Sequence, residues 1–136
     1  MSFALDPRLA ADTFEAADLE LSRVLLMNDS RYPWLILVPR RRALREIVDL
    51  DVAERAVLME EIAAASRFVR TLPGVEKLNV GALGNAVSQL HVHVLGRHAG
   101  DPAWPGPVWG AGAAVRYTAG EAEALIAQAR SALQGL

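Results

Sequence analysis

Apolar residues along this chain occur in short continuous runs that predict strands. Runs bounded by turn-forming residues predict one strand at 21–28 and a second, heavily buried strand at 34–38. Because few residues separate them, we expect these two strands to pair as a hairpin. A second pair is expected at 75–83 and 89–95, on either side of a Gly-Asn turn.

Helical spacing, in which apolar residues recur every three or four positions, occurs in longer segments. The clearest helix is expected at 51–72, where Asp51 and Glu54 have the spacing of a capping box. A second capping box predicts a C-terminal helix at 118–133, and Asp6-Pro7 predicts a short N-terminal helix. Together with the two strand pairs, these helices predict an α+β domain with a mainly antiparallel sheet.

Composition narrows the class of protein and the available chemistry. The 136 residues suit a single domain spanning 1–136, and 52% hydrophobic with 22% charged residues describes a compact globular chain. The net charge of −2 gives no sign of a nucleic-acid partner, which usually requires a basic excess. Because the chain has no cysteine, disulfides, zinc ribbons and thiol catalysis are excluded.

Nothing in the apolar pattern indicates a membrane partner. The first residues include Asp6 and Arg8 and lack the long apolar run of a signal peptide. The longest apolar stretches fall far short of the roughly 20 residues that a spanning helix needs. We therefore expect a cytoplasmic protein.

The segment from Gln89 to Leu95 carries the candidate chemistry. Side chains alternate between the two faces of a strand, so Gln89, His91 and His93 are expected to share one face at intervals of about 6.6 Å. The resulting row, about 13 Å long, suits a chain of phosphates. An imidazole can attack phosphorus or donate hydrogen bonds to its oxygens near neutral pH. The intervening residues are expected to point together into the core: Leu90, Val92 and Val94.

Two other interpretations of the histidines stay open on the H-x-H spacing alone. His91 and His93 can be polar residues on a solvated strand face, because short motifs carry a false-positive risk. They can also bind a transition metal, although two ligands on one strand make an incomplete site without a third.

The stretch at 83–97, LGNAVSQLHVHVLGR, resembles the signature of the histidine triad (HIT) family. That signature has three histidines alternating with hydrophobic residues, after a glycine-containing turn and before a basic residue. Residues 95–101 are similar to the branch that cleaves dinucleoside polyphosphates, and 25–40 to the family's nucleotide-pocket hairpin. The chain departs from the pattern twice, with Gln89 in place of the first histidine and Pro33-Trp34 in place of Gly-His.

The resemblance implies a HIT-like fold of about five strands and two main helices, and a role for each residue of the row. His91 corresponds to the histidine that attacks the α-phosphorus and forms a covalent nucleotidyl intermediate, with the Gln89 backbone carbonyl fixing its tautomer. His93 corresponds to a donor to the phosphate oxygens. The Gln89 side chain is implied to donate to phosphate, but an amide has no acidic proton for a leaving group.

Four further residues are implied to contact substrate: Asn28, Asn79, Asn85 and Gly84. Asn28 corresponds to a position that hydrogen-bonds the ribose, although starting a turn explains it equally well. Asn79 and Asn85 flank the glycine turn and can bond phosphate through their amides. For Asn85 a left-handed turn conformation is an equal alternative, and Gly84 supplies turn geometry.

These observations lead to one expected function and one rival. The expected function is hydrolysis or nucleotidyl transfer at the α-phosphate of a nucleoside phosphoramidate or dinucleoside polyphosphate, with a purine nucleotide as ligand and a homodimer as assembly. The protein is expected to need no metal of its own, and Mg²⁺ can accompany a polyphosphate substrate. The rival is a nucleotide-binding module in which Gln89 has removed efficient catalysis. The segment 104–109 is expected to cover the site, contact a second subunit or pack in its own core.

Overall fold

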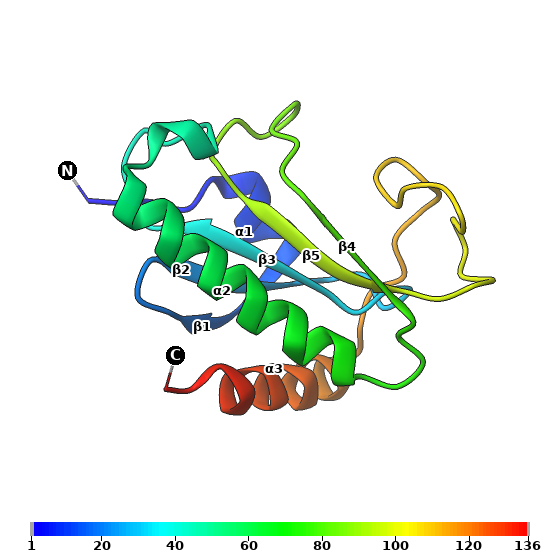
Figure 1. Cartoon of the computed structure of the whole chain (residues 1–136). Coiled ribbons are helices and arrows are strands. Elements are labelled where there is room, and N and C mark those ends of the chain that lie inside the picture. Colours follow the sequence, from blue (N-terminus) through cyan, green and yellow to red (C-terminus); the bar gives the residue numbers. More distant parts are fainter. Residues whose placement is uncertain (1, 136) are drawn as a thin grey trace.

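The computed structural model describes residues 2–135, which form one antiparallel sheet with helices and loops on both faces (Figure 1). The strands lie in the order β1-β2-β3-β5-β4. Their bounds are β1 Thr13–Asp18, β2 Ser22–Met27, β3 Trp34–Pro39, β4 Lys77–Gly81 and β5 Val92–Arg97. The helices are α1 Pro7–Asp12, α2 Val52–Thr71 and α3 Ala119–Leu133, and a short 3-10 helix, η1 Ile47–Asp49, precedes α2.

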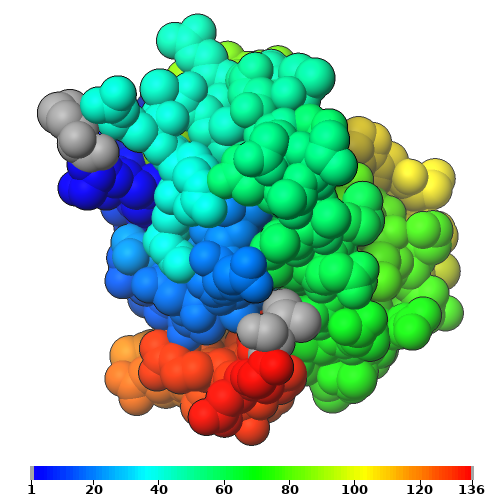
Figure 2. All heavy atoms as spheres, turned by 60° about the vertical axis from the view of Figure 1, so that its left-hand side comes forward, coloured from blue at the N-terminus to red at the C-terminus, as the bar shows by residue number. Residues whose placement is uncertain are grey.

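Alternation along the strands gives the sheet two apolar faces, each packed against different elements. One face, which carries Val24, Leu35 and Val94, packs against α2 and α3. The other face, which carries Leu25 and Ile36, packs against α1 and the long loop after β5. Figure 2 shows α3, in orange and red, beside the blue β1–β2 segment and the green α2. The candidate chemistry lies on the face covered by α1 and the loop.

The predicted hairpin and helices are confirmed. β2 and β3 pair antiparallel from Ser22–Pro39 to Leu26–Leu35. α2 and α3 each begin with the expected capping box, in which side chain and backbone bonds are exchanged between the N-cap and the third helical residue. α1 begins at Pro7, directly after its N-cap Asp6. No helix within residues 2–135 has the length and apolar character needed to cross a membrane.

Two features of the sheet differ from the expectation. β5 begins at Val92 because its ladder with β3 ends at the Leu37–Val92 pair, close to the proline that ends β3. Gln89 therefore precedes the strand, and the expected row of three side chains on a single strand is wrong. β1 has no counterpart among the predicted strands, because only Ala16 of its six residues is buried and a bulge interrupts its pairing with β2.

Candidate active site

His91 lies immediately before β5, and one hydrogen bond determines which of its ring nitrogens is free. Its Nδ1 lies 2.7 Å from the Gln89 carbonyl oxygen. Because a carbonyl only accepts, Nδ1 donates, and in the neutral ring Nε2 keeps its lone pair. This is the contact that the family resemblance implies, and the Gln89 backbone makes it whatever the side chain of that residue does.

His93, the second residue of β5, is 6% exposed and has the opposite arrangement of its ring nitrogens. The Trp34 indole N–H donates to His93 Nδ1 at 3.0 Å. An indole nitrogen is a donor only, so Nδ1 is an acceptor and the ring proton sits on Nε2. Burial, with a smaller contribution from neighbouring His91, lowers the pKa of His93 to about 4. His93 is therefore a neutral imidazole with one N–H available.

Aromatic rings enclose His93. Its ring centroid lies 5.7 Å from that of Trp34 and 5.3 Å from that of Trp109. The rings of His91 and His93 meet edge to face at 4.9 Å, so the two histidines lie on one side of the chain. Since Trp34 comes from β3 and Trp109 from the loop after β5, segments distant in sequence meet at this imidazole.

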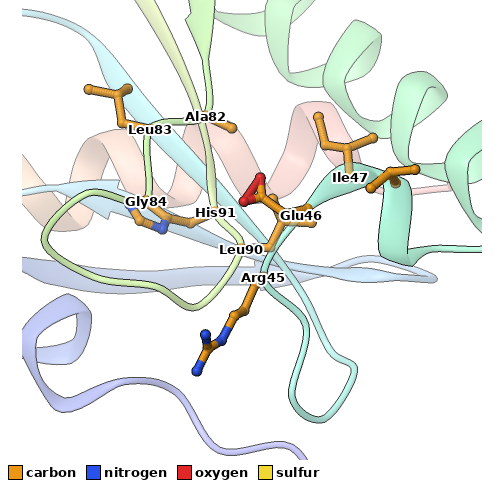
Figure 3. Close-up of a pocket in the computed structure, with 9 residues that line it drawn as sticks. Arg45, Glu46, Ile47, Ala82, Leu83, Gly84, Leu90 and His91 are labelled. Atoms are coloured by element: carbon orange, nitrogen blue, oxygen red, sulfur yellow. The ribbon is translucent and has the colours of Figure 1, made fainter.

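A hollow of about 380 Å³ opens beside His91 (Figure 3), a volume in the range of small-ligand pockets. One wall comes from residues 45–48, around the start of η1, and the other from 82–84, after β4. Gly84 has a left-handed backbone conformation (φ +73°) that favours glycine, and it turns the chain beside the His91 ring. Gly84 and His91 are the implied site residues that line this hollow.

The Gln89 side chain is bonded to the N-terminal segment. Its Nε2 donates to the Ala4 carbonyl at 2.8 Å, and its Oε1 accepts the Asp6 backbone N–H, also at 2.8 Å. Both polar ends of the amide are thus engaged by the chain that precedes α1. A contact between this side chain and a phosphate would require that segment to move.

Asn28 lies away from the histidines. Its Oδ1 accepts the Tyr117 backbone N–H at 2.9 Å, so the amide connects the end of β2 with the chain before α3. Leu26 of β2 pairs with Leu35 of β3, which in turn pairs with Val94 of β5, so Leu26 and Val94 are at the same level of the sheet. Asn28 lies two residues beyond Leu26, in the direction that leads away from His91. The side chain that was expected at the ribose therefore joins two parts of the fold.

Asn79 and Asn85 occupy different surroundings although they flank the same turn. Asn79 lies on β4, and its Oδ1 accepts a hydrogen bond from Arg97 at 2.9 Å. Asn85 is exposed. The structure thus brings Gly84 to the hollow beside His91, while the Asn79 amide oxygen is already engaged by a buried cation.

A buried ion pair that no sequence pattern predicted holds the loop after β5. Arg97 Nε lies 2.7 Å from Asp101 Oδ2, and a second bond joins Nη2 to Oδ1 at 2.9 Å. The Arg97 guanidinium is the main reason that the pKa of Asp101 falls to about 2. The sequence does place opposite charges four residues apart, at Arg97 and Asp101. That spacing predicts an ion pair within a helix, whereas Arg97 ends a strand.

The segment 104–109 packs mainly on its own domain. Val108 is buried in the cluster that covers the His93 face of the sheet, and Trp109 lies against His93 itself. Trp104 is 40% exposed, with its ring 5.6 Å from the Arg97 guanidinium carbon. Val108 therefore packs in the core of its own domain, and Trp109 covers the candidate site at His93.

Residues 10–100 match the family model described as the HIT domain, which is more than half of the chain. The chain belongs to the histidine triad (HIT) family. It is similar to a solved histidine triad protein from Marinobacter aquaeolei, with 47% identity, a TM-score of 0.94 and coverage of 100% of this chain and 99% of that one. A histidine triad protein from Bradyrhizobium japonicum gives 45% identity, a TM-score of 0.94 and coverage of 98% and 99%. No curated protein sequence matches the chain.

The HIT family is a superfamily of nucleotide-binding hydrolases and transferases. The fold agrees with this family, since the five-stranded antiparallel sheet places the histidine segment at the start of β5, an interior strand. Within residues 2–135, no three His, Asp or Glu side chains gather in a way that could hold a metal ion. The side chains at the site are two imidazoles, the surrounding indoles and the residues that line the hollow.

Proposed function

We propose that this HIT protein cleaves a nucleoside phosphoramidate or a dinucleoside polyphosphate at the α-phosphorus, with His91 as the nucleophile. The observation that carries the proposal is the 2.7 Å contact between His91 Nδ1 and the Gln89 carbonyl. That contact leaves a lone pair on Nε2 of a residue that lines a ligand-sized hollow.

The two histidines supply complementary groups for this reaction. His91 Nε2 forms a bond to phosphorus, the bond to the leaving group breaks, and a nucleotidyl-histidine results. His93 Nε2–H, fixed by the Trp34 bond at the other nitrogen, donates to a phosphate oxygen as its charge develops. Water then attacks phosphorus and releases the nucleotide and the free imidazole.

The same proposal includes the ligand and the assembly. A purine nucleotide is the substrate moiety, and Mg²⁺ accompanies the substrate when it is a polyphosphate. The protein acts as a homodimer in the cytoplasm and needs no metal of its own.

One observation favours a second candidate, a nucleotide-binding module with little or no catalysis. By the resemblance, Gln89 stands where the family has its first histidine, and its amide is engaged by Ala4 and Asp6. A side chain held in this way offers neither a charge nor a proton to a substrate. A module of this kind would bind AMP and release no product.

The test of the proposed function is His91→Ala, with His98→Ala as a matched control in an exposed loop. His91→Ala should abolish turnover of labelled substrate and leave AMP binding largely intact, because it removes the nucleophile. Acid-sensitive labelled adduct should be trapped on the wild-type protein and on His98→Ala. Retention of most activity by His91→Ala would refute the covalent mechanism, and AMP binding without turnover in the wild-type protein would establish the module.

A further inference from the structure

The hydrogen bond between Trp34 and His93 has only one possible direction. The indole N–H donates and His93 Nδ1 accepts, at 3.0 Å. A second proton on His93 would place one N–H against another inside a buried site, so this bond would break. Burial, which lowers the pKa of His93 to about 4, acts in the same direction. His93 can therefore donate from Nε2, but it does so as a neutral ring.

The side chain that stands at the first position of the family's row, Gln89, supplies no acid either. Gln89 cannot carry an acidic proton, and its amide is bonded to the N-terminal segment. Glu46 also lines the hollow, and its backbone carbonyl accepts the Asp49 N–H at 3.0 Å. Arg45, the other charged residue of the hollow, has a guanidinium that only donates hydrogen bonds.

We propose that Trp34 is a positioning residue that keeps His93 a neutral donor, so that the site selects nucleotides whose leaving group departs as a stable anion. The substrate class is an anhydride of a nucleoside monophosphate, with a phosphate or a carboxylate as the leaving group. An amine, as in a phosphoramidate, must take up a proton as it departs, and neither the neutral His93 ring nor the Gln89 amide gives one up. The inference rests on the proposed function and narrows its substrate class.

The step balances without a proton donor. The His91 Nε2 lone pair forms the bond to phosphorus, and the P–O bond breaks with its electron pair leaving on the oxygen of the phosphate or carboxylate. His93 Nε2–H hydrogen-bonds a non-bridging oxygen throughout. Water then attacks phosphorus, the N–P electron pair returns to His91, and the proton of the water passes to solvent.

The first experiment compares two substrates of the wild-type protein that both deliver AMP, diadenosine tetraphosphate and adenosine 5′-phosphoramidate. We expect kcat/KM to be greater for the anhydride by about 10²- to 10⁴-fold, the range that a missing general acid accounts for. Comparable values would overturn the inference and leave the proposed function intact. If neither substrate turns over and no adduct forms on His91, the proposed function fails and this inference fails with it.

The second experiment uses Trp34→Phe, with Trp109→Phe as the matched control. The Trp109 indole touches the same imidazole, but its N–H has no hydrogen-bond partner. Loss of one neutral hydrogen bond changes a rate or equilibrium constant by about 2- to 13-fold. Trp34→Phe should therefore narrow the ratio of the kcat/KM values of the two substrates by that factor. Trp109→Phe should leave the ratio unchanged, and an unchanged ratio in Trp34→Phe would overturn the inference.

Nitrogen NMR of the His93 ring gives a readout that does not depend on a variant. The wild-type protein should show a single Nε2–H tautomer between about pH 5 and 8, whereas Trp34→Phe, which lacks the donor to Nδ1, should show both neutral tautomers. A His93 ring that titrates in the wild-type protein over this interval would refute the positioning role. This spectrum and the substrate comparison remain decisive if Trp34→Phe does not fold.

Discussion

The position of one proton decides what each histidine can do. His91 and His93 are two residues apart and on one side of the chain, yet their neighbours leave them with opposite free groups. The Gln89 carbonyl leaves a lone pair on His91 Nε2, and the Trp34 indole leaves an N–H on His93 Nε2. Two chemically identical side chains thus present different groups, a free lone pair on His91 and a free N–H on His93.

Burial of His93 makes stability depend on pH. An unfolded imidazole takes up a proton near pH 6.5, whereas the folded ring does so only near 4. Between these values the unfolded state binds more protons, so the free energy of unfolding should fall as pH drops from about 6.5 to about 4, by up to about 3 kcal/mol. Urea denaturation across this interval measures the slope.

Two variants test whether His93 causes this pH dependence of the free energy of unfolding. His93→Phe should remove most of it, because the titrating ring is gone, and His98→Gln in an exposed loop should retain it. Equal slopes in His93→Phe and the wild-type protein would show that other groups are responsible. The carboxyls whose pKa values are lowered contribute at more acidic pH, and they are those of Asp18, Asp29, Asp101 and Glu121.

Two irregular segments cover the sheet face that carries His93. Leu9 of α1 and Val108 of the loop after β5 belong to one buried cluster on that face. The Gln89 amide holds the N-terminal segment, and the Arg97–Asp101 ion pair holds the loop. Exposure of the histidines therefore depends on how firmly these two attachments hold.

Gln89→Ala should release the N-terminal segment and leave the His91 tautomer unchanged, because the backbone carbonyl of residue 89 remains. Loss of two hydrogen bonds should lower the free energy of unfolding by about 1–3 kcal/mol, and the Asp6 amide should exchange faster with solvent. Denaturation and hydrogen exchange measure these effects, with Asn85→Ala at an exposed position as the control. Unchanged exchange at Asp6 would show that the segment is held by its apolar contacts alone.

The complete fold leaves the sheet with two edges, at β1 and at β4. A bulge in β1 disturbs its hydrogen-bonding pattern, whereas β4 pairs regularly over all five of its residues. Val80 on β4 and Leu83 just beyond it are 48% and 43% exposed. The β4 edge is therefore the one suited to pairing with a second copy of the chain.

Sedimentation of the wild-type protein at micromolar concentration should give twice the mass of the chain. Val80→Lys should give the single-chain mass, because a charge on an edge strand opposes strand pairing. Met59→Lys is the control, since that side chain is 60% exposed on α2 and distant from the edge strands in sequence. A wild-type monomer would remove the basis for a dimer, and a dimeric Val80→Lys would assign the contact to another surface.

The amino-acid sequence by itself determined the features that depend on near neighbours. Apolar runs and capping boxes predicted β2, β3, α1, α2 and α3, because alternation and N-terminal caps involve residues within a few positions of one another. The bond from His91 to the Gln89 carbonyl spans two residues, and the family signature was sufficient to anticipate it. The partner of the Asn28 side chain could not be anticipated in this way, since Tyr117 is 89 residues away.

Only the tertiary structure decided how the site is completed. The indole of Trp34 reaches His93 across 59 residues, and the Gln89 side chain reaches Ala4 and Asp6 across 85 and 83. Such contacts depend on strand register and on which segment covers which face, because a shift of one residue moves every side chain to the opposite face. The sequence thus indicated the chemistry at His91, whereas packing decided the protonation of His93 and the use of Gln89 as an attachment.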